Sequence, residues 1–76
     1  MDIKITLDAR GMLCPMPVLQ TAKKIKEIQQ GEILEVLADD EGAIEDLPAW
    51  CEQTGNTFLK YEKIEDYFSF LIKKGE

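Results

Sequence analysis

Four segments of the chain show the hydrophobic patterns of strands. Residues 3–8 and 67–73 alternate between apolar and polar positions, and residues 57–63 show a weaker form of the same pattern. This period of two is typical of a strand with one face on a core. Residues 33–38 are almost continuously apolar, which indicates a central strand buried on one face.

Two further segments repeat apolar residues at helical spacing. The first predicts a helix over 16–30, with Gly31 placed to end it. The second predicts a helix over 44–54, in which Ile44, Leu47 and Cys51 share one face. Pro48 interrupts this second pattern, so we expect its regular part to begin near Asp46 or Leu47, with Asp46 as the candidate cap.

The order of these elements is βαβαββ, in one domain over residues 1–76. The helical crossovers imply parallel pairing early in the chain, and the short connection at 64–66 implies an antiparallel hairpin late. We therefore predict an α/β (α+β) two-layer sandwich: a four-stranded mixed sheet with both helices on one face. The other face should be half exposed and carry the residues that alternate with the core set, Lys4, Thr6, Glu35 and Ser69.

The composition narrows the function classes. A net charge of -6 argues against direct binding of nucleic acid, which requires a basic face. The chain has no apolar run near the ~20 residues of a membrane span and no signal-peptide pattern, so we expect a cytoplasmic protein without a membrane contact. The absence of histidine excludes Cys–His nucleophilic pairs, and two cysteines without CxxC spacing make a metal site improbable; no cofactor is expected.

Cys14 is the candidate for chemistry, because it directly precedes the first predicted helix. A helix N-terminus favours the thiolate, which is the nucleophilic form of cysteine. Pro15 and Pro17 shape this helix start and leave chiefly the N–H groups of Met16 and Val18 near the sulfur. From the residues alone, a buried and inert cysteine remains the alternative.

Cys51 requires the opposite interpretation. It lies on the apolar face late in the second predicted helix, which favours packing in the core. The neighbouring Trp50 fits either a surface anchor or an aromatic residue that covers the sheet.

The segment Leu-Asp-Ala-Arg-Gly-Met-Leu-Cys-Pro-Met-Pro at residues 7–17 resembles the signature of the TusA/SirA-like sulfur-carrier family, whose hallmark is CPxP. The resemblance covers essentially the whole chain and continues through Gly31, Asp39-Asp40 and the segments 46–51, 54–55 and 70–74. The family fold is similar to the βαβαββ sandwich of the translation initiation factor 3 C-terminal domain, in agreement with the pattern.

The resemblance implies that Cys14 accepts sulfur as a persulfide. The donor would be a cysteine desulfurase or a rhodanese-like protein, and the sulfur would pass to an acceptor protein. tRNA thiolation, molybdenum cofactor assembly and sulfur oxidation are all destinations in the family. The chain would thus be an enzyme in the loose sense of a sulfurtransferase. The transfer is thiolate attack on a persulfide sulfur, which needs no histidine base.

The resemblance also assigns residues around Cys14. Asp8 and Gly11 match the family motif and are expected to shape the loop. Asp40 matches as well, and it should share one rim with Cys14 because the loops after parallel strands meet at one sheet edge. Asp40 is therefore a candidate contact for a partner protein.

Two basic residues are further candidates for partner contact. Arg10 could add positive charge near Cys14, with a solvated loop arginine as its alternative. Lys23 lies roughly 13 Å along the helix axis at ~1.5 Å per residue, too far to touch the sulfur.

Two other hypotheses remain open at this point. The chain could be a regulatory or adaptor module that uses Cys14 only as a contact. It could also be a thiol redox partner that forms a Cys14–Cys51 disulfide, provided that the two Cα atoms lie within ~7 Å.

The charge leads to a first test. We predict that the isolated protein does not bind tRNA measurably, even if its sulfur is destined for tRNA, because it lacks a basic stripe. Fluorescence anisotropy with labelled tRNA over a salt series measures this. Micromolar or tighter binding that weakens with salt would contradict the prediction, since that slope reports phosphate contacts.

Overall fold

The computed structural model describes residues 2–75 and contains the predicted elements in the predicted order. They are β1 (Ile3–Asp8), α1 (Met16–Lys24), the 3-10 turn η1 (Ile25–Glu27), β2 (Ile33–Ala38), α2 (Ala43–Thr54), β3 (Thr57–Ile64) and β4 (Tyr67–Lys73). The strand positions agree with the prediction, and β3 is one residue longer.

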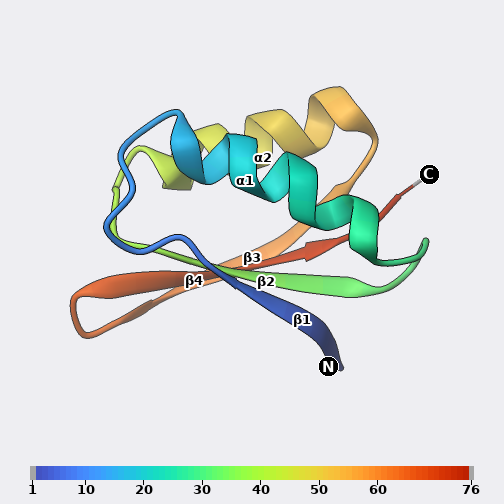
Figure 1. Ribbon diagram of the computed structural model, residues 1–76, viewed down its shortest axis with the longest axis horizontal. Helices are drawn as coiled ribbons and strands as arrows, with labels where there is room; N and C mark the ends of the chain where they lie inside the picture. The colour runs from blue at the N-terminus through green and yellow to red at the C-terminus, as the bar shows by residue number, and fades with distance from the viewer. Residues whose placement is uncertain (1, 76) are drawn as a thin grey trace.

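The four strands form one mixed sheet in the order β1-β2-β4-β3. β1 and β2 are parallel, whereas β4 is antiparallel to both β2 and β3. Both helices lie on the same face of this sheet (Figure 1). The two-layer sandwich predicted from the pattern is therefore confirmed, and β2 and β4 are its central strands.

The core fills the space between the sheet and the helices. Leu34, Val36 and Ala38 of β2 are buried, as are Phe70 and Ile72 of β4. They alternate with residues of the outer face, as a period of two requires. That outer face is less open than expected at Ser69, which is 6% exposed and donates a 2.6 Å hydrogen bond to Glu35. Glu35 also accepts a hydrogen bond from Thr6 at 2.9 Å, so one carboxylate links three strands.

The first helix ends earlier than predicted. α1 gives way to η1 at Ile25, and Ile28 is already extended (φ -116°, ψ 166°). Two contacts with Lys74 stabilise the extended segment that follows: its Nζ donates to the Ile28 carbonyl at 2.6 Å, and its carbonyl accepts the Gly31 N–H at 2.9 Å. Gly31 therefore serves the turn before β2, with φ +88°, and does not end the helix.

The second helix begins earlier than predicted. α2 starts at Ala43, and the N–H groups of Ala43, Ile44 and Glu45 each bond to the carbonyl three residues back. These bonds close a tight first turn ahead of Pro48. Asp46 therefore lies inside the helix and is not its cap, so its side chain is available for another contact.

Cys51 and Trp50 both belong to the core side of α2. Cys51 is 1% exposed, which confirms the prediction that it packs in the core. Trp50 is half-buried and packs against the same core, so it covers the sheet layer.

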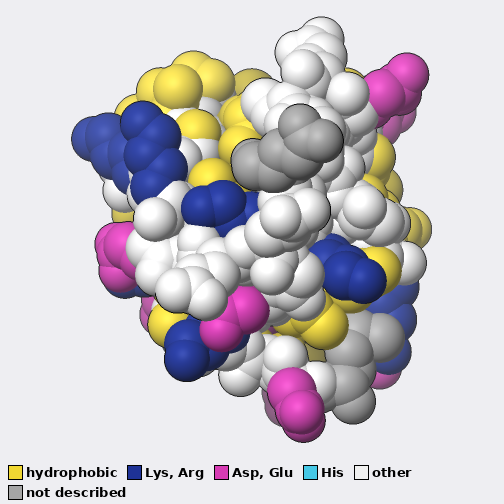
Figure 2. Space-filling model, turned by 90° about the vertical axis from the view of Figure 1, so that its right-hand side faces the viewer, with side chains coloured by type: hydrophobic (Ala, Val, Ile, Leu, Met, Phe, Trp, Pro, Cys, Tyr) yellow, Lys and Arg dark blue, Asp and Glu magenta, His cyan; other side chains and the backbone are white. Residues whose placement is uncertain are grey.

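The end of the molecule shown in Figure 2 has no patch of charges of one sign. Figure 2 shows basic and acidic side chains interspersed on this face, with apolar side chains between them. Within residues 2–75, no helix has the length and apolar character needed to cross a membrane.

The burial of Cys51 supports a stability test. We predict that Cys51→Ser lowers the free energy of unfolding by about 1–3 kcal/mol, because it places a hydroxyl in an apolar site. Urea denaturation measures the change. Cys51→Ala is the matched control, since it removes the sulfur without adding a polar group. A serine variant as stable as the alanine variant would contradict this explanation.

Candidate functional site

Cys14 lies in the loop that joins β1 to α1, two residues before the helix begins. Its side chain is exposed. Pro15 is the N-cap residue, and no side chain caps this helix. The Met16 N–H donates to the carbonyl of Leu13 at 2.9 Å. Of the two N–H groups expected near the sulfur, that of Met16 is therefore engaged elsewhere.

The two ends of this loop are anchored in the core. Ala9 is fully buried, and its N–H donates to the Leu37 carbonyl of β2 at 2.7 Å. Pro17 is buried at the start of α1, and its carbonyl accepts the Thr21 hydroxyl at 2.7 Å. Cys14 is thus exposed on a loop whose two ends are held.

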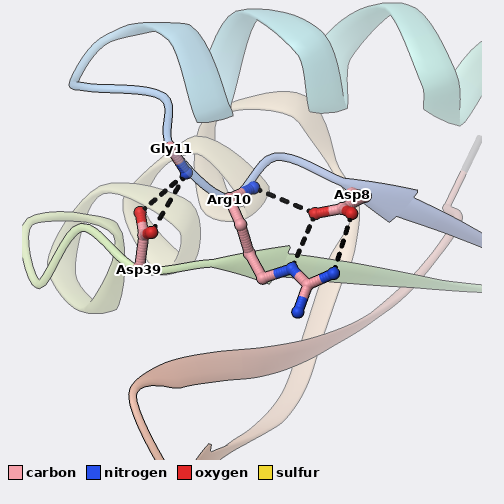
Figure 3. Close-up of polar contacts among 4 residues, drawn as sticks. All are labelled: Asp8, Arg10, Gly11 and Asp39. Carbon is pink, nitrogen blue, oxygen red and sulfur yellow. Dashed lines mark hydrogen bonds and ion pairs between the residues drawn. The ribbon is translucent and has the colours of Figure 1, made fainter.

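Asp8, Arg10 and Gly11 organise the first part of the loop (Figure 3). The carboxylate of Asp8 accepts the Arg10 backbone N–H at 3.1 Å and two guanidinium N–H groups at 2.9 and 3.0 Å. Gly11 has φ +83°, which an L side chain rarely adopts, and its N–H donates to both oxygens of Asp39 at 3.0 Å.

The Arg10 guanidinium binds groups other than the Cys14 sulfur. Its guanidinium pairs with Asp8 and stacks over the ring of Tyr67, with 4.8 Å from Cζ to the ring centroid. The expected positive charge beside Cys14 is thus engaged elsewhere. Lys23 is exposed in the last turn of α1, at the opposite end of that helix from Cys14.

Asp40 lies beside Cys14, as the loop argument predicted. Its Oδ2 accepts the Cys14 backbone N–H at 2.9 Å, and its Oδ1 accepts the Gly42 N–H at 3.0 Å. One carboxylate therefore joins the Cys14 loop to the start of α2.

Asp46 approaches the sulfur itself. Its Oδ2 lies 3.1 Å from the Cys14 Sγ and accepts the thiol proton. We call Asp39, Asp40 and Asp46 the aspartate clasp, because each accepts a hydrogen bond from the β1–α1 loop. The sequence argument included only Asp40. Extending the same rule to the whole loop after β2 and to the first turn of α2 would have brought Asp39 and Asp46 to the same edge, without assigning the group that each contacts.

The clasp reverses the electrostatics predicted for the thiol. The pKa of Cys14 is raised, first by the hydrogen bond to Asp46, then by partial desolvation of the thiol, and then by the charges of Asp46 and Asp40. A carboxylate so close to the sulfur disfavours a second negative charge there. The surroundings of Cys14 therefore favour the thiol over the thiolate, and the opposite effect predicted from the helix dipole is corrected.

Three apolar residues close to Cys14 in the sequence are exposed. Leu13 is 76% exposed, Met16 40% and Leu19 49%. Cys51 is separated from this surface, because it lies five residues beyond Asp46 in α2 and is buried. Burial raises the pKa of the Cys51 thiol to about 11. Residues 2–75 contain no group of three or more His, Cys, Asp or Glu side chains that could hold a metal ion.

The chain is similar to known proteins over most of its length. The model of the family described as sulfurtransferase TusA matches residues 5–74. The chain is 38% identical over 73 residues to the sulfur carrier protein TusA of Allochromatium vinosum, and the match covers 96% of each chain.

Two further relatives agree with this match. YrkF of Bacillus subtilis is 40% identical over 75 residues, which are 99% of this chain; the chain spans only 40% of the length of YrkF. The crystal structure of a SirA-like protein from Desulfitobacterium hafniense superposes with a TM-score of 0.75 at 32% identity, and covers 95% of this chain and 99% of that chain.

The Asp8–Arg10 pair leads to a pH-dependent prediction. The hydrogen bond and charge of Arg10 lower the pKa of Asp8 to about 2. A carboxyl whose pKa is lowered on folding adds stability that is present above about pH 4, its ordinary range. That contribution is lost as the pH falls towards about 2. We predict that Arg10→Gln returns the Asp8 pKa towards its ordinary value, measured by NMR titration. Lys4→Gln, which removes the Lys4–Glu32 pair instead, should leave the Asp8 pKa unchanged.

Proposed function

This chain belongs to the TusA sulfurtransferase family, and on that premise we propose that Cys14 accepts sulfur as a persulfide from a donor protein and passes it to an acceptor protein. The observation that carries the proposal is the contrast between the two thiols. Cys14 is exposed on a held loop, whereas Cys51 is buried in the core. A relay by direct protein contact requires a sulfur that two different partners can reach in turn.

The surroundings of Cys14 fit docking by other proteins. Leu13, Met16 and Leu19 are close to it in the sequence, are exposed, and supply apolar area at the surface. The donor we propose is a protein that carries its own cysteine persulfide, such as a cysteine desulfurase or a rhodanese-like protein. The relay operates in the reducing cytoplasm, where the two free thiols stay unpaired.

The transfer is an exchange without net oxidation. The Cys14 sulfur attacks the outer sulfur of the donor persulfide, and a new S–S bond forms on Cys14. The S–S bond of the donor breaks, and the donor cysteine leaves with the electron pair and takes up the proton that Cys14 loses. One thiol and one persulfide react, and one thiol and one persulfide are formed. The same steps, with Cys14 as the donor, deliver the sulfur to the acceptor.

The burial of Cys51 speaks against a redox cycle between the two cysteines. Asp46, which touches the Cys14 sulfur, lies in the first turns of α2, and Cys51 is five residues further, about 7.5 Å along the helix axis at ~1.5 Å per residue. Cys51 is also 1% exposed, so a disulfide with Cys14 would require the core to open.

Mass spectrometry tests the relay directly. After incubation with a cysteine desulfurase and cysteine, we predict an adduct of about 32 Da, one sulfur atom, that a thiol reductant removes and that peptide mapping assigns to Cys14. Cys14→Ser should abolish the adduct and remain folded, because serine retains a donor for Asp46. Cys51→Ser is the matched control and should keep it.

Two outcomes would reject the proposal. One is an adduct on Cys51; the other is sulfur uptake by Cys14→Ser at the wild-type rate. The adaptor hypothesis predicts no adduct on either cysteine, with partner binding retained in both variants.

A further inference from the structure

Asp46 is the one side chain in direct polar contact with the Cys14 sulfur among the described residues, at 3.1 Å. It reaches the sulfur from α2, across 32 positions of sequence. Asp46 is in the first turn of that helix. Its side chain is therefore held against an exposed thiol by the position of α2.

Every charged group that faces Cys14 carries the same sign. The loop after β2 contributes Asp40, and α2 contributes Asp46. On the β1 side, Arg10 pairs with Asp8 and stacks on Tyr67. On the α1 side, residues 16–22 are uncharged. Loss of the thiol proton would therefore place a negative charge beside two carboxylates, with no positive group facing it among the described residues.

We propose that Asp46 is a specificity-determining residue, which keeps Cys14 a neutral thiol in the free protein and reserves it for donors that bring a cationic group to the Asp46 carboxylate. This inference rests on the proposed role of Cys14 as the sulfur acceptor. It excludes free anionic sulfur compounds, such as inorganic polysulfide, because they meet a protonated thiol and two negative charges. The raised pKa of Cys14 agrees with this arrangement.

Docking of a suitable donor reverses the effect of Asp46 on the Cys14 thiol. A lysine or arginine side chain of the donor pairs with the Asp46 carboxylate and takes the place of the S–H donor. The thiol then loses its proton to solvent, and the thiolate attacks the outer sulfur of the donor persulfide. The S–S bond of the donor breaks, and the donor cysteine leaves as a thiolate that takes up a proton. The exchange balances without an oxidant or reductant.

Alkylation rates test the effect of Asp46 on the reactivity of Cys14 without any sulfur donor. Asp46→Asn removes the carboxylate and keeps the size of the side chain. We expect iodoacetamide to label Cys14 in this variant roughly tenfold faster at pH 7, the order of magnitude of one charge-assisted hydrogen bond. The pH at which labelling reaches half its maximum should fall. Iodoacetate, which is anionic, should gain more than iodoacetamide.

Glu45→Gln is the matched control. It removes one negative charge from the adjacent position in the same turn of α2, but Glu45 has no contact with the sulfur and does not contribute to its pKa. We expect labelling within twofold of the wild-type rate. Equal rates in Asp46→Asn and Glu45→Gln would overturn the proposal. If Asp46→Asn does not fold, thiolate absorbance of the wild-type protein decides instead: a Cys14 midpoint at or below that of free glutathione overturns it.

Sulfur uptake from inorganic polysulfide tests the specificity. We expect Asp46→Asn to gain the adduct of about 32 Da faster than the wild type, and Glu45→Gln to match the wild type. Equal uptake by Asp46→Asn and the wild type would overturn the proposal. The proposed relay is rejected by a different result, the absence of a Cys14 adduct after incubation with a desulfurase. That result does not affect the alkylation rates.

Discussion

The hydrogen bonds of the aspartate clasp hold the Cys14 loop in place. Asp39, Asp40 and Asp46 bind the Gly11 N–H, the Cys14 N–H and the Cys14 thiol respectively. The β1–α1 loop makes few bonds of its own at its tip, so its conformation depends on these carboxylates. The parallel pairing of β1 and β2 makes the clasp available, because it brings the ends of both strands to one edge of the sheet.

The clasp also sets the chemical state of the sulfur. A helix N-terminus would favour a thiolate, but its field acts within the first turn, and Cys14 lies before that turn begins. Asp46 is closer to the sulfur and negative. The nearer charge outweighs the helix N-terminus, so accessibility and reactivity are separated: Cys14 is exposed, but its pKa is raised. An exposed thiol that stays protonated resists unspecific oxidation and alkylation, since the thiolate is the reactive form.

The rest of the molecule supplies the rigidity on which this depends. The buried residues of β2 and β4 fix the sheet, and α2 packs on it through Leu47 and Cys51. α2 must not shift, because its first turn carries Asp46. At the opposite end of α1, Lys74 follows β4 and donates a hydrogen bond to the Ile28 carbonyl, just after η1.

The sequence by itself determined the elements and the sides they bury. Alternation and short apolar runs are local properties, so the four strands were predictable nearly to the residue. The burial of Cys51 followed equally from its place on an apolar helix face. The position of Asp40 could be inferred because the βαβ rule relates two loops without reference to side chains.

Only the tertiary structure decided which polar groups meet. Asp46 and Cys14 are 32 positions apart, and Lys74 and Ile28 are 46 apart. No periodicity in the chain encodes such pairs, because they depend on the exact register and the side-chain directions at the meeting point. Arg10 shows the same limit over a short distance: its charge was evident in the sequence, but its pairing with Asp8 and Tyr67 was not. The protonation state of Cys14 depends on these contacts, and so it was a property of the folded molecule alone.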